Sequence, residues 1–290
     1  MIDKSTRLTK LDLVRYYESI APWMVPHLKG RPCSLVRGPS GVGRQLFFQK
    51  HVDKGGIKGI VELDASLWPG HAPLLEVPTA CAIAAAAQMN VIEFHTWNST
   101  TANMEKPDRI VFDLDPGEGV PWKAVKEGAE LMRSLLRELE LDAWLKTSGG
   151  KGLHIVVPLA RRHAWDTVSK FSEAAVQHLA KIIPNRFVAK SGPRNRIGKI
   201  FVDFLRNRHG ATTAAAFSAR ARPGLGVSMP ISWERLDEVK SSIQWTIKNA
   251  REYVSLEKVD PWAGYWTCKQ SLNSGIKALR MPKEKPGRGE

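Results

Sequence analysis

Between residues 109 and 205 the chain alternates between two hydrophobic periods, and the order of these segments restricts the fold more than any other feature of the sequence. Apolar residues at every second position predict a strand, whereas an apolar stripe at every third or fourth position predicts a helix. The expected elements, in order, are a strand at 109–116, a helix that starts near Pro121, strands at 142–147 and 153–157, a helix at 164–183 and a strand at 199–205. This β-α-β-β-α-β order is that of the split ferredoxin-like unit. We therefore predict an α+β fold in which the first of these strands lies between the third and the fourth.

The residues before this unit predict a smaller α/β part that packs on the core sheet. A helix is expected in the first thirty residues, with one face formed by Leu8, Leu11, Val14, Tyr17 and Ile20. Further along, strands are expected at 35–43 and 45–51, a buried helix at 77–89 and a strand at 91–97. We expect residues 1–290 to form one compact domain, with an N-terminal part at 1–108, a core at 109–230, a helical part at 231–280 and a linker-like tail at 281–290.

Three aspartates interrupt the apolar pattern of the core strands. Asp113 and Asp115 share one face of the first strand, and Asp203 lies in an otherwise apolar fourth strand. If the helices cover the opposite face, the three carboxylates converge on the open face of the sheet. Unpaired carboxylates are costly to bury, and hard divalent cations bind carboxylate oxygens. We interpret the set as a site for one or two Mg²⁺ or Mn²⁺ ions; a solvated strand end before Pro116 is the alternative for the first pair.

A glycine-rich turn joins the second and third core strands. Its sequence, Ser148-Gly-Gly-Lys-Gly-Leu-His154, lets backbone N–H groups approach an anion closely, because glycine lacks a side chain. Ser148, Lys151 and His154 would offer a hydroxyl, a cation and an imidazole to the sugar and phosphates of a nucleotide. A hairpin turn needs no ligand to exist, so the motif gains weight only from the neighbouring aspartates.

Arginines follow the Asp203 strand closely. Arg206 lies just after it, and Arg220 and Arg222 are two residues apart on a segment that we expect to be extended. Arginines at that spacing on a strand share a face and can bind triphosphate oxygens in a forked geometry. A solvated basic edge, or contacts with a nucleic-acid backbone, are the alternatives.

The net charge is +14, from 43 Lys and Arg against 29 Asp and Glu, which indicates a polyanionic partner such as nucleic acid. No basic amphipathic helix with an apolar anchoring face is evident, so a membrane surface is not expected. The three cysteines are far apart and lack the spacing of a zinc site or a disulfide framework, which suits a reducing cytoplasm.

A few residues of the N-terminal part are weaker candidates. On a strand, one of the adjacent Phe47 and Phe48 should face the core and the other outwards, and an outward Phe beside Lys50 could stack on a base, although two core aromatics are the more common arrangement. His95 shares a strand face with Glu93, where a structural histidine is the usual case. Lys10 is expected on the polar side of the first helix as a solvated charge.

The motifs around Asp113, Ser148 to His154, and Asp203 resemble the three motifs of the archaeo-eukaryotic primase superfamily. More narrowly, nearly the whole chain is similar to the polymerase domain of the bacterial ATP-dependent DNA ligase called ligase D. The likeness also includes the segments at 45–51, 95–98 and 219–224. It implies a primase-like fold with a core sheet similar to that of RNA-recognition motifs.

The resemblance implies a polymerase of bacterial non-homologous end joining that adds ribonucleotides, in preference to deoxyribonucleotides, to DNA ends and gaps, with or without a template. It implies that two Mn²⁺ or Mg²⁺ ions bind the three aspartates. It also implies DNA ends with a 5'-phosphate, Ku, and ligase or nuclease modules of the same polypeptide as partners, in the bacterial cytoplasm at the nucleoid. The residues that would contact the nucleotide are Phe47, Phe48, Lys50, His95, Ser148, Lys151, His154, Arg206, Arg220 and Arg222, and Lys10 would contact the 5'-phosphate.

Three other functions fit parts of the sequence. A primase that starts chains de novo often carries a zinc element, which these cysteines do not supply. A metal-dependent nuclease would use clustered aspartates but needs no arginine array for a triphosphate. A non-catalytic nucleic-acid-binding module would explain the charge, yet its aspartates would repel the phosphates it binds.

Overall fold

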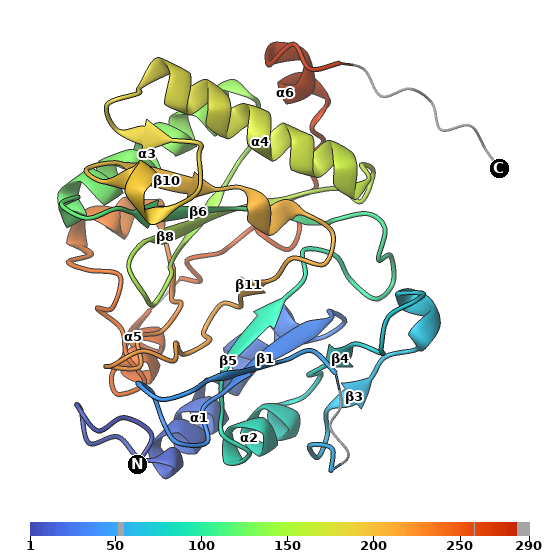
Figure 1. Ribbon diagram of the computed structural model, residues 1–290, viewed down its shortest axis with the longest axis vertical. Coiled ribbons are helices and arrows are strands. Elements are labelled where there is room, and N and C mark those ends of the chain that lie inside the picture. Colours follow the sequence, from blue (N-terminus) through green and yellow to red (C-terminus); the bar gives the residue numbers. More distant parts are fainter. Residues whose placement is uncertain (52–54, 258, 283–290) are drawn as a thin grey trace.

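Two layers of strands lie between outer helices in the computed structural model, which describes residues 1–51, 55–257 and 259–282 (Figure 1). Helices α3 (Trp122–Glu138) and α4 (Trp165–Ile182) cover the upper layer in the view of Figure 1, and helices α1 (Lys10–Leu28) and α2 (Ala80–Gln88) cover the lower layer. Both sheets are therefore covered by helices on their outer sides.

The upper layer is a six-stranded sheet with the order β12-β7-β8-β6-β10-β9. Its strands are β6 (Arg109–Pro116), β7 (Trp144–Thr147), β8 (Leu153–Pro158), β9 (Phe187–Val188), β10 (Ile200–Asp203) and β12 (Pro230–Ile231). Strand β6 pairs with β8 on one side and with β10 on the other, both antiparallel. This arrangement confirms the predicted β-α-β-β-α-β core with its first strand in a central position.

The register of β6 separates an apolar face from a polar one. Ile110, Phe112 and Leu114 are fully buried and belong to the large hydrophobic core that also holds the apolar stripes of α3 and α4. The residues that alternate with them point to the other face of the sheet. Residue Asp113 lies directly opposite His154 on β8 and opposite Asp203 on β10.

The lower layer is a four-stranded sheet with the order β11-β5-β1-β2. Its strands are β1 (Cys33–Arg37), β2 (Phe47–Gln49), β5 (Val91–Thr96) and β11 (Thr213–Ala214). The remaining helices and strands are β3 (Val61–Glu62), β4 (Leu75–Glu76), α5 (Ala250–Leu256) and α6 (Asn273–Ala278), and 3-10 helices lie at Ala65–Leu67, Pro193–Arg196, Leu205–Asn207 and Trp233–Glu238.

Helix α1 begins at Lys10 because Thr9 caps it, and its buried face differs from the predicted one. The Thr9 side chain accepts a hydrogen bond from the backbone N–H of Asp12, and the Asp12 side chain binds back to the backbone of Thr9, which satisfies helix-end donors reciprocally. Leu8 therefore lies before the helix, although it is buried, and the prediction that Leu11 joins the apolar face is wrong, because Leu11 is 55% exposed. The later positions of the predicted stripe are buried in the core as expected.

The prediction for Phe47 and Phe48 is also wrong, because neither ring enters the core. The two side chains are 49% and 51% exposed. Strand β2 has only three residues and lies at the edge of its sheet, so neither of its faces is covered at these positions. Both rings are therefore accessible.

One buried hydrophobic cluster extends from Ile2 to Leu272 and includes residues of the N-terminal, central and C-terminal parts of the chain. No helix among the described residues is long and apolar enough to cross a membrane. Most of the expected linker at 281–290 lies outside the described residues, which end at 282.

The turn before β8 approaches the central strand so closely that it leaves no room for a side chain. The Gly152 backbone N–H donates to the Ser148 hydroxyl, and its carbonyl accepts from the Ser148 backbone N–H and the Ser242 hydroxyl. A Cβ atom at Gly152 would overlap the carbonyl oxygen of Leu114 on β6. Glycine at this position is therefore required by the packing of the turn on β6.

We expect Gly152→Ala to lower the free energy of unfolding by about 3 kcal/mol, because the turn must move away from β6 and lose its hydrogen bonds. Urea denaturation monitored by circular dichroism measures the change. Gly55→Ala is the matched control, since a Cβ there meets no atom within 4 Å, and it should change the free energy by less than about 0.5 kcal/mol. Equal stabilities for the two variants would show that the close approach is not required.

Candidate active site

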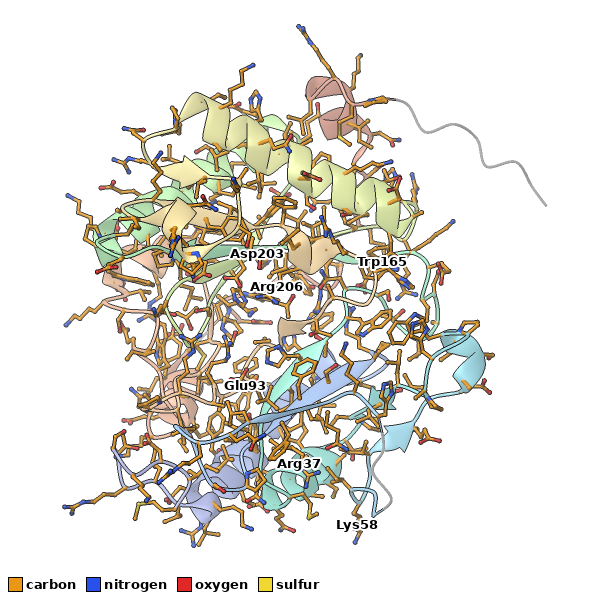
Figure 2. All side chains as sticks on the ribbon, viewed as in Figure 1. Arg37, Lys58, Glu93, Trp165, Asp203 and Arg206 are labelled. Carbon is orange, nitrogen blue, oxygen red and sulfur yellow. The ribbon has the colours of Figure 1, made fainter. Side chains whose placement is uncertain are left out.

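Three carboxylates lie on the polar face of the six-stranded sheet, as the sequence predicts. Asp113 and Asp203 are direct cross-strand neighbours, and Asp115 lies two residues further along β6 on the same face. Figure 2 shows Asp203 and Arg206 in the upper layer, on the side that faces Glu93 of the lower layer. The carboxylates are thus directed to the region between the two sheets.

Arginines neutralise this acidic face. The Arg206 Nε atom lies 3.1 Å from Asp203 Oδ2 and 3.8 Å from Asp113 Oδ2. Arg196, from the 3-10 helix before β10, forms an ion pair with Asp115. With these pairings, the described residues contain no group of three or more His, Cys, Asp or Glu side chains drawn together as a ready metal site.

The carboxylates differ in their electrostatic environment. Burial alone would raise the pKa of Asp113, but the His154 imidazole and the Arg206 guanidinium lower it below its ordinary value. Burial raises the pKa of Asp203; the Arg206 guanidinium opposes this shift, while the carboxylates of Asp113 and Asp115 add to it. A cation placed among these groups would relieve the repulsion that Asp203 experiences. The donor set of three carboxylates therefore fits a hard divalent ion.

The imidazole of His154 is held between an amine and a carboxylate. The Lys146 Nζ atom lies 2.6 Å from His154 Nδ1, and His154 Nε2 lies 3.3 Å from Asp113 Oδ1. Burial and the charge of Lys146 lower the pKa of His154 to about 4, so the ring is neutral at pH 7. Because Nδ1 faces a donor, the ring proton resides on Nε2 and points to Asp113.

Lys146 is itself buried and fully engaged. Besides its contact with His154, its amine donates to the carbonyl oxygen of Ala214 at 3.0 Å and to the hydroxyl of Ser228 at 2.6 Å. The Ser228 hydroxyl donates onwards to the carbonyl oxygen of Thr147, so it accepts from Lys146. Burial and the charge of Arg220 lower the pKa of Lys146 well below its ordinary value. The side chain thus fixes the orientation of His154 from the protein interior.

The Ser148 side chain stabilises the glycine-rich turn through hydrogen bonds within the turn. The Ser148 hydroxyl accepts from the backbone N–H groups of Gly150 and Gly152 and bonds the Ser242 hydroxyl. It is buried, so its contacts as they stand are with the turn rather than with the open face. The neighbouring Lys151 side chain is exposed.

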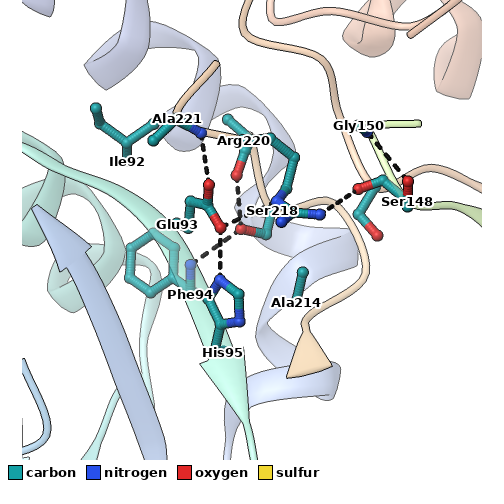
Figure 3. A network of polar contacts seen from close by, with 12 residues as sticks. Ile92, Glu93, Phe94, His95, Ser148, Gly150, Ala214, Ser218, Arg220 and Ala221 are labelled. Carbon is teal, nitrogen blue, oxygen red and sulfur yellow. Dashed lines mark hydrogen bonds and ion pairs between the residues drawn. The ribbon is translucent and has the colours of Figure 1, made fainter. Parts of the chain in front are cut away.

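A second polar network joins the two sheets (Figure 3). The Glu93 carboxylate accepts from Arg220 Nε at 2.9 Å and from the Ala221 backbone N–H at 2.6 Å, and it lies 2.5 Å from His95 Nε2. Arg220 also donates to the carbonyl oxygen of Ser148 at 2.7 Å. Against the effect of burial, His95 and Arg220 lower the pKa of Glu93 to about 2. Arg220 therefore links β5 to the glycine-rich turn.

The segment that carries the two later arginines is not a strand, so the prediction that they share a strand face is wrong. It contains a single bridge residue, Ala219, and a positive φ of 65° at Phe217 turns the chain. Arg222 is exposed, and its guanidinium lies 3.8 Å from the position of a Cβ built on Gly150. The two arginines approach the same turn in spite of the irregular backbone.

The remaining candidates, Phe48, Lys50, His95 and Lys10, lie in the N-terminal part of the chain. The rings of Phe48 and His95 make an edge contact with centroids 6.0 Å apart, and Lys50 Nζ lies 5.8 Å from the centre of the Phe48 ring. Burial lowers the pKa of His95. Lys10 is exposed at the start of α1, on the outer helix layer. Lys10 therefore lies on a different layer from the strands that carry the carboxylates.

Sequence reasoning missed three residues that the fold brings to this site. Lys146 and Glu93 are charged residues next to apolar residues in predicted strands, a signal similar to the one that identified Asp203. Arg196 lies in an irregular segment, where no periodicity indicates its direction. Its pairing with Asp115 depends on tertiary structure alone.

Comparisons with known proteins agree with this geometry. The family model described as "LigD, primase-polymerase domain" matches residues 9–262. The chain is 50% identical over 278 residues to the multifunctional non-homologous end joining protein LigD of Pseudomonas aeruginosa, covering 96% of this chain and 33% of that protein. It is 34% identical over 234 residues to the protein of the same name from Mycolicibacterium smegmatis, covering 80% of this chain and 31% of that protein.

A solved structure shares the fold. The polymerase domain of Mycobacterium tuberculosis ligase D in complex with DNA superimposes with a TM-score of 0.80 at 28% identity, covering 88% of this chain and 91% of that one. The present chain spans about a third of the length of the two curated relatives. By the family match and these identities, the chain belongs to the LigD primase-polymerase domain family, an enzyme family of nucleotidyltransferases.

Proposed function

We propose that this chain adds nucleotides to DNA ends and gaps during bacterial non-homologous end joining, by phosphoryl transfer with two divalent ions. It would use ribonucleotides in preference to deoxyribonucleotides, with or without a template. The observation that carries the proposal is the direct cross-strand pairing of Asp113 with Asp203 on a face that also presents Asp115, His154 and Arg206. Carboxylates in this arrangement are suited to metal-assisted phosphoryl transfer.

Asp113, Asp115 and Asp203 would hold the metal ions, Mn²⁺ or Mg²⁺. When bound, such ions neutralise charge on the phosphates and lower the pKa of an attacking hydroxyl. Arg206 and Arg196 now neutralise these carboxylates, so both side chains would have to share or release them. Arg206 would then be free to bind the triphosphate, which would lie beside Asp113 and Asp203.

The nucleotide would lie between the two sheets. When Asp113 binds a metal ion, His154 would turn its Nε2 proton from Asp113 to a phosphate oxygen, because Lys146 keeps Nδ1 as an acceptor. Phosphate-binding cations would come from Arg220, Arg222 and Lys151, all near the glycine-rich turn. The residues expected at the sugar and base are Ser148, His95, Lys50, Phe47 and Phe48.

The exposed aromatic pair supports a stacking role. Phe47 and Phe48 are accessible on a sheet edge, and base–aromatic stacking contributes about 1–3 kcal/mol per base. Lys10 would contact the 5'-phosphate at a break. Its position on the outer helix layer means that the DNA would have to extend well beyond the carboxylates to reach it.

The relatives named above are multifunctional end joining proteins. We propose that residues 1–290 act as one polymerase domain with a linker-like tail at 281–290, and the buried cluster that extends from Ile2 to Leu272 supports this. Ligase and nuclease modules of the same polypeptide, and Ku, would be its partners at the nucleoid in the cytoplasm. The direct experiment compares addition of ATP and dATP to a 5'-phosphorylated gapped duplex, with and without Mn²⁺.

We expect Asp113→Ala to abolish templated addition, with a loss of at least about 10³-fold, or about 4 kcal/mol in activation free energy. Primer extension in Mn²⁺ on the gapped duplex measures the loss. Asp166→Ala on α4 is the control, because this exposed carboxylate pairs with Lys170 of the same helix. If Asp113→Ala extends the primer as well as the parent chain does, the assignment of the metal site is wrong.

His154→Ala should raise the KM for the nucleotide about tenfold or more, since a hydrogen bond to a charged phosphate contributes about 1.5–3 kcal/mol. DNA affinity, measured by fluorescence anisotropy without nucleotide, should remain within about twofold, because the imidazole faces Asp113 rather than an outer surface. Equal losses in both measurements would assign His154 to the fold instead of to the nucleotide site.

Glu93→Gln tests whether the charged Glu93 carboxylate both stabilises the fold and holds Arg220 in place. Folding lowers the pKa of Glu93 from 4.5 to about 2, so its ionised carboxylate stabilises the folded state above about pH 4.5, and this contribution is lost as the pH falls towards 2. Unfolding experiments should show that the parent chain loses up to about 3 kcal/mol more than the variant does between pH 6 and 2.5. The KM for the nucleotide at pH 7 should also rise, because Arg220 loses its partner.

The control for this change is Glu138→Gln, which alters an exposed residue near the end of α3. It should reproduce the pH dependence and KM of the parent chain. A Glu93→Gln variant whose stability changes with pH as that of the parent does would disprove the role of the Glu93 ion pair.

A further inference from the structure

A cavity of about 590 Å³ lies at the opposite end of β6 from the aspartates. Its walls come from the end of α1 and the residues just after it, the chain at 158–162 and the chain at 265–269, with Thr100 and Asp108 completing the lining. Backbone hydrogen bonds hold these segments together, from Leu159 N–H to the Asp108 carbonyl at 2.7 Å and from Ala160 N–H to the Gln270 carbonyl at 2.8 Å. The cavity is therefore part of the folded framework.

The walls of this cavity are strongly positive. Its basic residues are Lys29, Arg31, Arg161, Arg162 and Lys269, and its one acidic residue is Asp108. Both terminal nitrogens of Arg31 bind the carboxylate of Asp108 at 2.7 Å, so this acid is already neutralised. The other four cations are exposed, and none forms an ion pair within 4 Å among the described residues, although Arg161 acts on Asp108 over a longer distance. Mutual repulsion of these cations favours a bound anion.

An aromatic ring stands beside the cations. Trp266 is 47% exposed although it is a large apolar side chain. Its ring packs edge-on against Tyr265 and at a tilt against His27, and both ring centroids lie 4.9 Å from the Trp266 centroid. These contacts hold the indole in place. A supported and accessible indole is a suitable platform for an unpaired base.

This cavity is distinct from both regions discussed above. Asp108 precedes Asp113 by five residues, which corresponds to about 17 Å along an extended strand. Lys10 and Lys29 mark opposite ends of α1, which has 19 residues and therefore spans about 28 Å. The cavity thus lies away from the acidic face and from the expected contact with the 5'-phosphate.

We propose that this cavity binds single-stranded nucleic acid, with Arg161 and Arg162 on backbone phosphates and Trp266 stacked on a base. Lys29 and Lys269 add positive charge to the same walls. Arginine forks bind carboxylates as well as phosphates, but a stacking ring next to them favours a ligand that carries bases. The site would be a second binding region for an unpaired strand, separate from the proposed nucleotide site.

The experiment measures binding of a fluorescein-labelled twelve-residue oligothymidylate by anisotropy, with EDTA present and in the Asp113→Ala background. Nucleotide addition then plays no part, and failure of this proposal is distinguishable from failure of the proposed function. Arg161→Ala/Arg162→Ala should weaken binding about tenfold and make the slope of log K against log salt shallower by about 1.4, since each lost phosphate contact contributes about 0.7.

Further variants distinguish the effect of net charge on binding from the effects of the arginines and of the Trp266 ring. Arg137→Ala/Lys181→Ala removes two positive charges from the exposed surfaces of α3 and α4 and should change the Kd less than twofold. Arg161→Lys/Arg162→Lys should restore the salt slope of the parent. Trp266→Ala should weaken binding about fivefold or more, because one stacked base contributes about 1–3 kcal/mol, while leaving the salt slope unchanged.

Several results would overturn the proposal. Equal affinities for the Arg161/Arg162 variant and the Arg137/Lys181 control would show that only net charge matters. Displacement of the labelled strand by polyglutamate as effectively as by unlabelled oligothymidylate would identify an acidic peptide as the ligand. Displacement by AMP at an equal concentration of phosphate would identify a free nucleotide instead.

Discussion

The structure depends on an unfavourable contact, the placement of Asp113 directly opposite Asp203 on neighbouring strands. Like charges across a strand pair destabilise a sheet, so the fold must bring cations to this point. Arg206 approaches both carboxylates, and Arg196 pairs with Asp115. The acidic face is thus compensated by side chains that a divalent ion could displace, which suits a site that binds metal and triphosphate together.

The two sheets are joined by the same residues that orient the candidate catalytic groups. Lys146, from the six-stranded sheet, bonds His154 and the carbonyl of Ala214 on the four-stranded sheet. Arg220 joins Glu93 of the four-stranded sheet to the turn at Ser148. Each contact satisfies a buried polar group, and burial without a partner would be costly. The same two polar networks therefore build both the interface between the sheets and the proposed nucleotide site.

Positive charge is distributed unevenly between two ends of β6. Near the aspartates, Arg196, Arg206 and Arg220 are in ion pairs. In the cavity beside Asp108, Arg31 pairs with that carboxylate, and four further cations face solvent. The first set is arranged by the carboxylates it neutralises. The second set contains more cations than its single lining carboxylate can neutralise, and its positive potential is available to an external polyanion. A net charge of +14 alone does not distinguish these two uses.

The sequence by itself determined the core topology and the face on which Asp113, Asp115 and Asp203 meet, because strand alternation and helix periodicity are local properties. Periodicity could not place the rings of Phe47 and Phe48, since their exposure depends on β2 being a short edge strand. The ion pair of Arg196 and the burial of Lys146 were likewise decided only by tertiary structure. Such contacts join residues far apart in the chain, and their geometry depends on how the sheets and irregular segments pack.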